Sequence, residues 1–397
     1  MELIHLKIAV ITDVFYPYIA GGAEKRYYEI LKRLSKKNEI HVYTQYWKNT
    51  KKEEKYNGIY IHRLNYVKNL YTKTGRRKIT PAILFSIFLF FKLFNAPKFD
   101  IIESNLFPYL PCFISKLFSL IKRSKYSILF HEVWGKYWYN YFHNDIFSII
   151  GRVIEIMASH LTKNIITYTP TIKDLIARSF KISKGNIFLI PSGVDMELFN
   201  KSSDNKRYNQ LIFIGRLIPE KRPEILIESL KLIKKRITLL IIGDGPQKTY
   251  IKQIIKNNNR HEIKFLGIQS YNNIVKYLSK SSIFILPSVR EGQGIVFLES
   301  MAAKTPVIGV KKFDSGVKNI IKNNYNGFLI EKDNIKELAT KINILLNNNE
   351  TYKKFQKNGY NFASHFDWNT ISRLLFIYYM KLLNKKIEIS EFKYFWD

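Results

Sequence analysis

Short apolar segments alternate with helices along this chain, and this alternation restricts the fold more than any other feature of the sequence. In the first half, the pattern predicts strands at 7–13, 40–43, 59–63, 100–102, 127–130 and 165–169. It predicts helices at 23–34, at 79–94 and from about residue 170. Alternating strands and helices are typical of a parallel, doubly wound sheet that is covered by helices on both faces.

The same alternation starts again after a polar segment. The expected strands are 211–214, 238–242, 263–266, 283–286 and 306–310, and the expected helices are 223–233, 272–278 and 295–303. A chain of 397 residues is too long for one ordinary core. The sequence therefore predicts two Rossmann-like α/β domains, 1–195 and 211–366, which are joined by a linker at 196–210 and face each other across a cleft.

Three features indicate the compartment. The single cysteine, Cys112, allows no intrachain disulfide, which fits a reducing environment. The apolar start at 8–11 lies between Lys7 and Asp13 and precedes no small-residue cleavage site, so no secretory signal is expected. The longest uncharged apolar run, 79–91, is shorter than the roughly 18 residues that a membrane span needs. We therefore expect a cytoplasmic protein.

The net charge is +32, from 64 basic and 32 acidic residues. It is spread evenly, because 30 basic and 14 acidic residues precede residue 196, and 34 and 18 follow. Nucleic acid, anionic lipid and phosphorylated small molecules would all be attracted by such a charge. A genomic bias toward Lys, Asn and Ile would produce the same excess, so charge alone leaves these interpretations open.

The segment 287–299 carries the most informative functional pattern. A strand ends in a loop with Gly292 and Gly294 before a helix begins, and both glycine loops and helix N-termini bind phosphate. Glu291 stands at the carboxyl end of the strand, where open α/β sheets bind ligands. Glu299 follows about two helical turns later, so both carboxylates can face one site. Sugar hydroxyls are their expected partners, because carboxylates repel phosphate. A solvated helix face is the alternative, but it does not explain the glycines.

Two cations follow the first strand of the second half. Arg216 comes after strand 211–214, and Lys221 comes five residues later. Arg binds a diphosphate by bidentate hydrogen bonds and Lys acts as a point charge. If the diphosphate is a leaving group, its charge grows in the transition state, and these cations would stabilise it. The alternative is that both lie on a solvated basic loop.

At three further positions, the residues alone do not decide between a structural and a functional role. Gly21 and Gly22 lie between the first strand and helix, where either a close ligand or a simple tight turn requires glycine. His131 ends an apolar strand, and a lone histidine there is more often structural than catalytic. The turn at 243–246 is interpreted as mostly structural, lining the expected cleft.

In their order along the chain, these residues resemble the landmarks of the family-4 retaining glycosyltransferases (glycosyl transferase group 1), whose fold is GT-B. Glu291 and Glu299 match the E-x7-E motif of that family. The other matching segments, which cover nearly the whole chain, are 21–24, 131, 191–195, 215–217, 221, 243–246, 301–303 and 305–307.

The resemblance implies that a hexosyl group moves from a nucleotide-diphosphate sugar to a glycan or lipid-linked acceptor with retention of configuration. The transfer would be front-face, with the leaving phosphate oxygen helping to deprotonate the acceptor. The first domain would then be on the acceptor side and the second would bind the donor. The final segment, 367–397, with an aromatic-rich helix at 368–383, would cross back to the first domain.

The resemblance also assigns residues. It places His131 against the hydroxymethyl group of the donor sugar, although Glu132 follows it where the family often has Asp. The expected catalytic residues are His131, Arg216, Lys221 and Glu291. The expected donor-binding residues are Gly21, Gly22, Arg216, Lys221, Gly267, Glu291, Gly292, Gln293, Gly294 and Glu299.

No metal and no permanently bound cofactor are expected. The sequence contains no Asp-x-Asp triplet and no His/Cys cluster with metal-ligand spacing. It also has no Walker-type phosphate loop and no evident Ser-His-Asp set. Arg216 and Lys221 would therefore take the place of a metal beside the diphosphate.

A membrane surface is a further expected partner. Residues 55–99 include nine basic residues and no acidic one, and Arg76, Arg77 and Lys78 directly precede the apolar segment 79–91. Basic residues beside a Phe-rich helix suit an anionic membrane surface. A core helix that follows an ordinary solvated loop explains the pattern equally well.

Two other functions compete with transfer. A GT-B epimerase or hydrolase would use the same donor site and would turn the donor over without an acceptor. A basic nucleic-acid-binding protein is an alternative of another class, but no recognition module accompanies the charge, so nucleic acid is not an expected partner. A catalytically inactive binding subunit is disfavoured because both glutamates and both cations are present.

Overall fold

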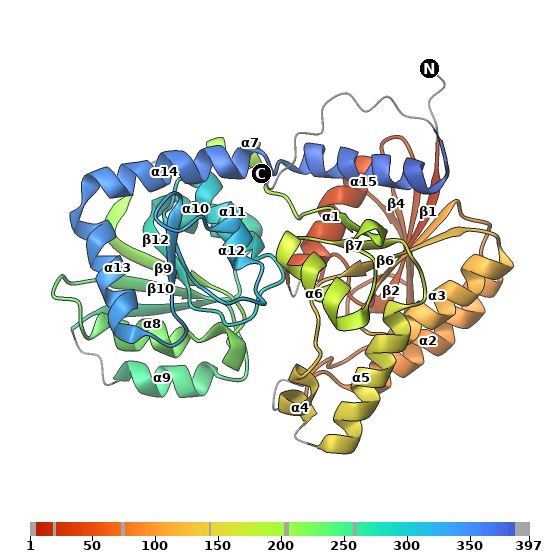
Figure 1. Ribbon diagram of the computed structural model, residues 1–397, viewed down its shortest axis with the longest axis horizontal. Coiled ribbons are helices and arrows are strands. Elements are labelled where there is room, and N and C mark those ends of the chain that lie inside the picture. Colours follow the sequence, from red (N-terminus) through yellow and green to blue (C-terminus); the bar gives the residue numbers. More distant parts are fainter. Residues whose placement is uncertain are drawn as a thin grey trace. The chain divides into compact units, whose positions relative to one another are not determined.

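The computed structural model describes residues 5–18, 21–72, 76–142, 144–201, 206–256 and 260–385. The described residues divide into two compact units. Unit 1 lies within Met1–Pro191 and Trp368–Tyr394, and unit 2 lies within Ser192–Asp367. Each unit contains one sheet with helices on both faces, so the predicted pair of Rossmann-like folds is confirmed (Figure 1).

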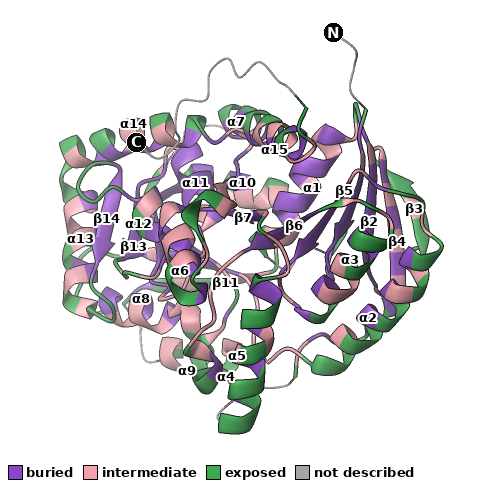
Figure 2. Cartoon of the chain, turned by 45° about the vertical axis from the view of Figure 1, so that its right-hand side comes forward, coloured by how far each residue is buried: buried purple, intermediate pink, exposed green. Residues whose placement is uncertain are grey.

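The sheet of unit 1 has the order β3-β4-β2-β1-β5-β6-β7-β8 among the described residues. Its strands are β1 (Lys7–Ile11), β2 (Glu39–Tyr46), β3 (Glu53–Tyr56), β4 (Ile59–Tyr66), β5 (Ile101–Asn105), β6 (Lys125–Phe130), β7 (Ile165–Thr167) and β8 (Ile187–Leu189). All neighbours pair in parallel except β3, which pairs antiparallel with β4 at the edge. The central strands are buried, as Figure 2 shows, because helices cover both faces.

The helices of unit 1 are α1 (Gly22–Leu34), α2 (Ile79–Phe94), α3 (Leu110–Ile121), α4 (Tyr137–Phe142), α5 (Asp145–Ser159), α6 (Pro170–Phe180) and α15 (Trp368–Leu382), with a 3-10 turn, η1 (Lys184–Asn186). Helix α1 buries Tyr27, Ile30, Leu31 and Leu34, the spacing of one helical face. A single buried core joins α2, α3, α5 and α6 to the sheet, so these helices share one face, and α1 and α15 lie on the other (Figure 1).

Helix α15 comes from the end of the chain but belongs to unit 1. Its Trp368 is fully buried, and its Tyr379 hydroxyl donates to the carboxylate of Glu103 on β5 at 2.9 Å. The Tyr378 hydroxyl lies 2.8 Å from that of Ser127 on β6. Residues 386–397 of the final segment lie outside the described residues.

The sheet of unit 2 has the order β11-β10-β9-β12-β13-β14 and is parallel throughout its described pairs. Its strands are β9 (Arg207–Ile214), β10 (Thr238–Ile242), β11 (Glu262–Gly267), β12 (Ser281–Leu286), β13 (Val307–Val310) and β14 (Gly327–Ile330). Its helices are α7 (Met196–Asn200), η2 (Pro219–Lys221), α8 (Pro223–Leu230), α9 (Lys248–Lys256), α10 (Tyr271–Lys280), α11 (Ile295–Ala302), α12 (Val317–Ile320), α13 (Ile335–Asn347) and α14 (Asn349–Ser364).

The segment 196–210, expected as a linker, differs from that expectation. It contains α7 and the start of β9, and its residues 202–205 lie outside the described residues. The Asp195 carboxylate caps α7 by accepting from the Leu198 N–H at 3.0 Å, and Met196 and Phe199 enter the core of unit 2. The units therefore divide after Pro191. The sequence did not indicate this boundary, because the polar composition of 201–207 resembles a linker. Only two buried side chains, Met196 and Phe199, anchor the short helix α7.

Candidate active site

The strand order of unit 2 reverses between β9 and β12. The chain leaves β9 toward β10 on one side, and it leaves β12 toward β13 on the other. Loops at the carboxyl ends of two such strands diverge, and ligands bind in the crevice they leave. Arg216 and Lys221 follow β9, and Glu291 follows β12, so the predicted cations and the predicted carboxylate lie at this switch point.

The structure brings Lys221 and Glu291 together. The Lys221 ammonium and the Glu291 carboxylate form an ion pair, with 15% and 11% of the two side chains exposed. The loop after β12 is fixed beside η2, because the Val289 N–H donates to the Glu220 carbonyl at 2.9 Å. The Ser288 hydroxyl donates to the same carbonyl at 3.1 Å. Lys221 is therefore held at a defined position, with its charge matched by Glu291.

The turn at 243–246 positions Arg216. The Gly215 N–H donates to the Ile242 carbonyl at 3.0 Å, and the Leu217 N–H donates to the Asp244 carbonyl at 2.9 Å. A Cβ atom at Gly243 would lie 2.0 Å from the carbonyl oxygen of Gly215, so only glycine allows this approach. The backbone on both sides of Arg216 is thereby fixed, while its side chain is exposed at the edge of the sheet.

Helix α11 begins at this edge. Gly292 lies in the preceding loop, and Gly294 is the N-cap with φ 79° and no side-chain cap. The first N–H groups of a helix and its dipole favour an anion when no side chain caps them. Gly267 ends β11 at the same edge with φ 64°, and its carbonyl accepts from the Gly243 N–H at 2.8 Å.

Gln293 and Glu299 are both buried, each with 3% exposed. The Gln293 side-chain oxygen accepts from the Ser192 N–H at 2.7 Å, and its amide donates to the Ser192 carbonyl at 3.1 Å. This amide is engaged with backbone, so Gln293 holds the loop instead of presenting a free amide to a donor. Glu299 lies on α11, and its burial rules out the solvated helix face that was the alternative.

In unit 1, Gly21 and Gly22 stand at the start of α1. Gly21 is the N-cap in an extended conformation, which any residue adopts, and Gly22 is the first helical residue. Residues 19 and 20, which precede them, lie outside the described residues. Both glycines therefore mark a helix N-terminus beside β1, on the side where the strand order of unit 1 reverses between β1 and β5.

His131 follows β6 and is a neutral hydrogen-bonding group. Burial lowers the pKa of His131 to about 3, helped by the nearby Arg26 and Arg77 guanidinium groups. Its Nδ1 hydrogen-bonds the Tyr168 hydroxyl, and its buried Nε2 has no hydrogen-bond partner among the described residues. A buried ring nitrogen without a partner is costly, so its position suits a ligand hydroxyl.

The sequence interpretation missed a buried ion pair in unit 1. Asp13 follows β1, and its carboxylate pairs with the guanidinium of Arg77, which lies 5.2 Å above the Phe107 ring. Burial raises the pKa of the Asp13 carboxyl above its ordinary value, although Arg77 opposes the shift. The position of Asp13 directly after the first strand was a usable signal, because carboxyl ends of parallel strands carry sites. Arg77 gave no such signal.

Two cavities are lined by residues other than the predicted site residues. One, about 560 Å³, is lined by Lys206, Tyr208, Lys304, Asn349, Tyr352, Lys353 and Gln356. The other, about 210 Å³, is lined by Gly135, Lys136, Arg152, Glu155, Ile156, Ser179 and Phe180. Within the described ranges, no three His, Cys, Asp or Glu side chains are grouped so that they could hold a metal ion.

Comparisons with known proteins agree with this geometry. The model of glycosyl transferases group 1 matches residues 195–362, and that of glycosyltransferase family 4 matches residues 20–198. An uncharacterised glycosyltransferase of Methanocaldococcus jannaschii is 28% identical over 90% of this chain and 94% of its own length. A UDP-Gal:α-D-GlcNAc-diphosphoundecaprenol α-1,3-galactosyltransferase of Escherichia coli is 28% identical over 47% of this chain and 52% of its own length.

A solved structure shows the same fold. Anabaena HepE in complex with UDP-glucose superposes with a TM-score of 0.74 and 19% identity, covering 96% of this chain and 100% of that protein. The two family models overlap at residues 195–198, a few residues after the start of unit 2, and together extend over most of the sequence. The chain therefore belongs to the group 1 glycosyltransferases and is a nucleotide-sugar-dependent glycosyltransferase with the GT-B fold.

Proposed function

We propose that this enzyme transfers a hexosyl group, with retention of configuration and without a metal ion, from a nucleotide-diphosphate sugar to a glycan or lipid-linked acceptor. One observation carries the proposal. Lys221 and Glu291 are in contact at the switch point of unit 2, beside the exposed Arg216 and the uncapped start of α11. This arrangement offers two cations and a helix N-terminus to a diphosphate, and carboxylates to a sugar.

The chemistry follows from these positions. The bond between the anomeric carbon and the phosphate oxygen breaks, and the negative charge of that bond pair collects on the diphosphate. Arg216 and Lys221 stabilise this charge as it grows. The acceptor hydroxyl forms the new bond on the same face, and its proton passes to the departing phosphate oxygen. Glu291 and Glu299 bind hydroxyls of the donor.

His131 is proposed as a ligand of the transferred sugar. Its low pKa keeps the ring neutral, so Nε2 exchanges a hydrogen bond with a hydroxyl and brings no second positive charge. Gly21, Gly22, Gly267, Gly292 and Gly294 allow backbone to approach the donor, and Gln293 supports the loop that carries Glu291. Unit 1 would be the acceptor side, and unit 2 would bind the donor.

The acceptor is proposed to be lipid-linked, at the inner face of an anionic membrane. The name of the Escherichia coli relative specifies a diphosphoundecaprenol acceptor, which supports this choice. Within the described residues, no helix is long and apolar enough to span a bilayer. We propose that contact with lipid is peripheral.

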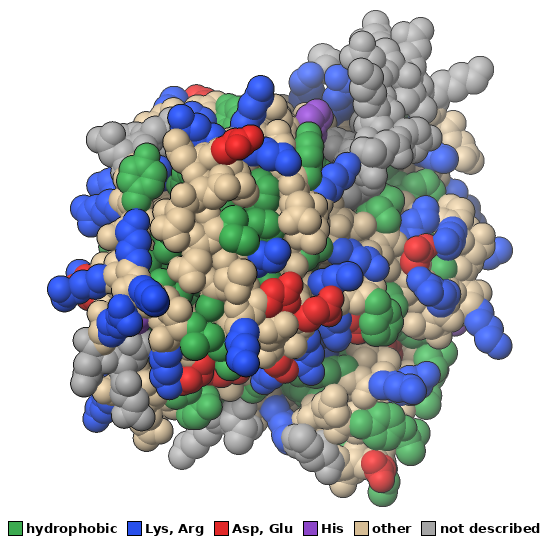
Figure 3. All heavy atoms as spheres, turned by 60° about the vertical axis from the view of Figure 1, so that its left-hand side comes forward, with side chains coloured by type: hydrophobic (Ala, Val, Ile, Leu, Met, Phe, Trp, Pro, Cys, Tyr) green, Lys and Arg blue, Asp and Glu red, His purple; other side chains and the backbone are tan. Residues whose placement is uncertain are grey.

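The competing functions are less well supported. Among the described side chains on the face drawn in Figure 3, Lys and Arg are scattered and not gathered in one stripe, which does not favour nucleic-acid binding there. An epimerase or hydrolase would use the same donor loops, and only a dependence on acceptor separates it from a transferase.

Two measurements test the proposal. Sugar nucleotides are screened by thermal shift, beginning with UDP-sugars because UDP-glucose occupies HepE, and the donor should raise the melting temperature by mass action. Transfer is then assayed with that donor and lipid-diphosphate or glycan acceptors, with and without excess chelator. Product that needs acceptor and resists the chelator supports the proposal. Donor consumption without acceptor would favour the epimerase or hydrolase. Loss of product on chelation, restored by magnesium, would contradict metal independence.

A further inference from the structure

Helix α5 exposes its apolar side to solvent and buries small and polar side chains. Its buried positions include Ser148, Gly151 and Glu155, which are small or polar. Its exposed positions are apolar except for Asp145, and Ile146 is 68% exposed. An ordinary surface helix has the opposite arrangement, with its apolar stripe toward the core.

The inward face of α5 is fixed, so the helix cannot rotate to hide its apolar side. The Glu155 carboxylate accepts from the N–H groups of Trp134 at 2.7 Å and Gly135 at 3.0 Å, and from the Trp138 indole at 3.0 Å. A Cβ atom at Gly151 would lie 2.8 Å from the Trp138 ring, so a larger residue could not pack this close to the ring without a shift. Rotation would break three hydrogen bonds of a buried charge.

Helices α2 and α3 extend the same kind of surface. They pack against each other on the sheet face that α5 also covers. Neither contains an acidic residue, and every exposed residue on them is apolar except Thr80. We call the exposed apolar side chains of the three helices the apolar helical face: Ile79, Ile83, Leu84, Ile87, Phe88, Phe91, Phe94, Leu110, Leu117, Leu120, Ile121, Ile146, Phe147, Ile149, Ile150, Val153, Ile156 and Met157.

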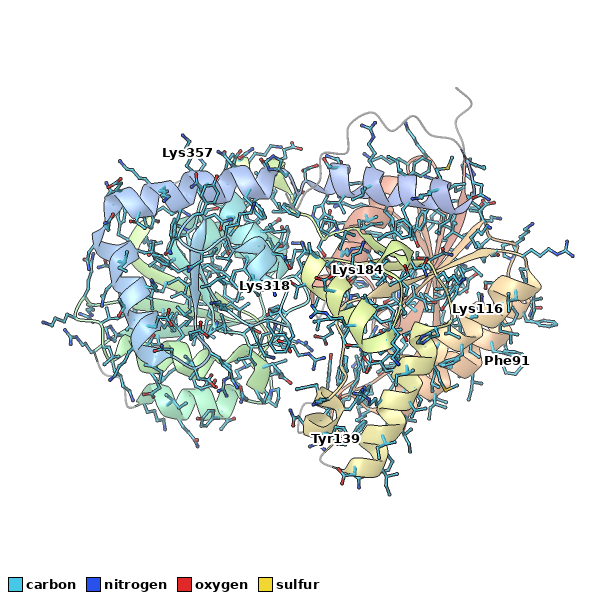
Figure 4. All side chains as sticks on the ribbon, viewed as in Figure 1. Phe91, Lys116, Tyr139, Lys184, Lys318 and Lys357 are labelled. Atoms are coloured by element: carbon cyan, nitrogen blue, oxygen red, sulfur yellow. The ribbon has the colours of Figure 1, made fainter. Side chains whose placement is uncertain are left out.

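The figures agree with this arrangement. Figure 2 shows the outer sides of α2 and α5 as exposed, and Figure 4 shows Phe91 pointing away from the sheet. Phe91 is 64% exposed. Exposed apolar side chains on monomers are usually scattered singly. Eighteen of them on one layer of helices therefore mark an interaction surface.

The composition of the apolar helical face favours a lipid surface over a protein partner. It has almost no hydrogen-bonding side chains, whereas a protein interface has about one hydrogen bond per 100–200 Å². The exposed residues Lys78, Lys98, Arg123 and Lys125 lie at or near the ends of α2 and α3 and supply positive charge at its border. Two copies of a chain with net charge +32 would repel each other, while anionic head groups would be attracted.

We propose that the apolar helical face docks on an anionic lipid bilayer, with α5 inserted shallowly at the boundary between head groups and acyl chains. The basic border then lies among the phosphates, as in interfacial amphipathic helices. This inference deepens the proposed function, because it rests on a lipid-linked acceptor, and it adds α3 and α5 to the region 55–99 that the sequence indicated.

The test is sedimentation of the full chain with vesicles of phosphatidylcholine, with and without phosphatidylglycerol. The variant Phe147→Ser/Ile150→Ser should lower the partition coefficient on anionic vesicles by about tenfold or more, because two inserted side chains are lost. The matched control is Leu232→Ser/Tyr250→Ser, which changes two equally exposed apolar residues of unit 2 and should bind like the parent. All four positions are exposed, so both proteins should fold, and circular dichroism checks this.

Three results would overturn the proposal. They are no binding of the parent to anionic vesicles, equal binding by parent and α5 variant, and a parent that self-associates in sedimentation velocity while the α5 variant is monomeric. The last would assign the face to a second copy of the chain. The vesicles contain neither donor nor acceptor, so this assay reports on docking alone. The result of the vesicle assay can therefore be interpreted even if the transfer assay fails.

Discussion

Arg216 and Lys221 are the residues on which the proposed mechanism depends. Replacing either by Ala should lower turnover more than it weakens donor binding, because their contact with the diphosphate strengthens as charge develops. Loss of one such contact typically costs about 10²–10³ in rate. Steady-state kinetics beside calorimetric donor affinities measure both effects. Glu299→Gln is the contrast, and it should mainly raise the Michaelis constant of the donor. Lost affinity with unchanged turnover in the cation variants would mean that they only hold the donor.

His131 predicts a pH dependence of stability. Its folded pKa is lowered to about 3, while an unfolded histidine titrates near pH 6.5, so the unfolded chain takes up a proton first as pH falls. Its stabilising contribution is therefore full above about pH 6.5 and declines toward about pH 3. Between about pH 7.5 and 5, this group should cost the fold at most about 2 kcal/mol. Urea unfolding at both pH values should show a smaller acid loss in His131→Gln. Equal losses of stability in the parent and the variant would mean that the pKa of His131 is not lowered in the folded protein.

At the scale of elements, the start of α11 depends on one backbone conformation. Gly294 has φ 79°, and an added Cβ would lie 2.7 Å from the Phe297 ring, so Gly294→Ala should destabilise unit 2 and weaken donor binding. The left-handed conformation alone costs about 1–2 kcal/mol in a residue with a Cβ. Gly267→Ala is the control, because its φ is 64° and its Cβ would meet nothing within 4 Å. Similar losses in both variants, measured by thermal unfolding, would exclude the contact with Phe297 as a cause.

The basic segment before α2 divides into residues with different roles. Arg77 is paired with the buried Asp13, so only Arg76 and Lys78 are suited to contact lipid. Arg76→Glu/Lys78→Glu should reduce binding to anionic vesicles, since each basic residue near such a surface contributes about 1 kcal/mol. Arg77→Glu should instead destabilise unit 1 by about 3–5 kcal/mol, because Asp13 loses its partner. A stable Arg77→Glu protein with weak vesicle binding would reverse these roles.

At the scale of the whole molecule, helix α15 follows unit 2 in the sequence but belongs to unit 1, like strand β1. Ending the chain at Asp367 would remove α15, with the fully buried Trp368 and the hydroxyl that binds Glu103. Unit 1 should then unfold at lower urea, since a buried carboxylate without its donor costs roughly 1–3 kcal/mol in addition to the lost packing. Hydrogen exchange would locate the change in β5 and β6, while strands of unit 2 keep their protection. Equal effects in both units would contradict the assignment of α15 to unit 1.

The sequence by itself determined the alternation of elements and which proposed site residues stand at strand ends. The segment 79–94 matches α2 to the residue, and Arg216, Lys221 and Glu291 follow strands as the hydrophobic pattern predicts. Hydrophobic period and glycine positions depend on neighbours a few residues away, so they can be detected in one sequence. The antiparallel β3 was missed because its four residues are largely charged and lie at an edge.

Only the tertiary structure decided which of these residues touch. The ion pair of Lys221 and Glu291 joins positions 70 residues apart, and the bonds of Gln293 to Ser192 join positions 101 residues apart. Such contacts depend on how strands order in a sheet and how loops pack, which no local pattern encodes. The same reason hid the inverted α5. Only the tertiary packing shows that Glu155 faces inward, where three donors compensate the burial of its charge.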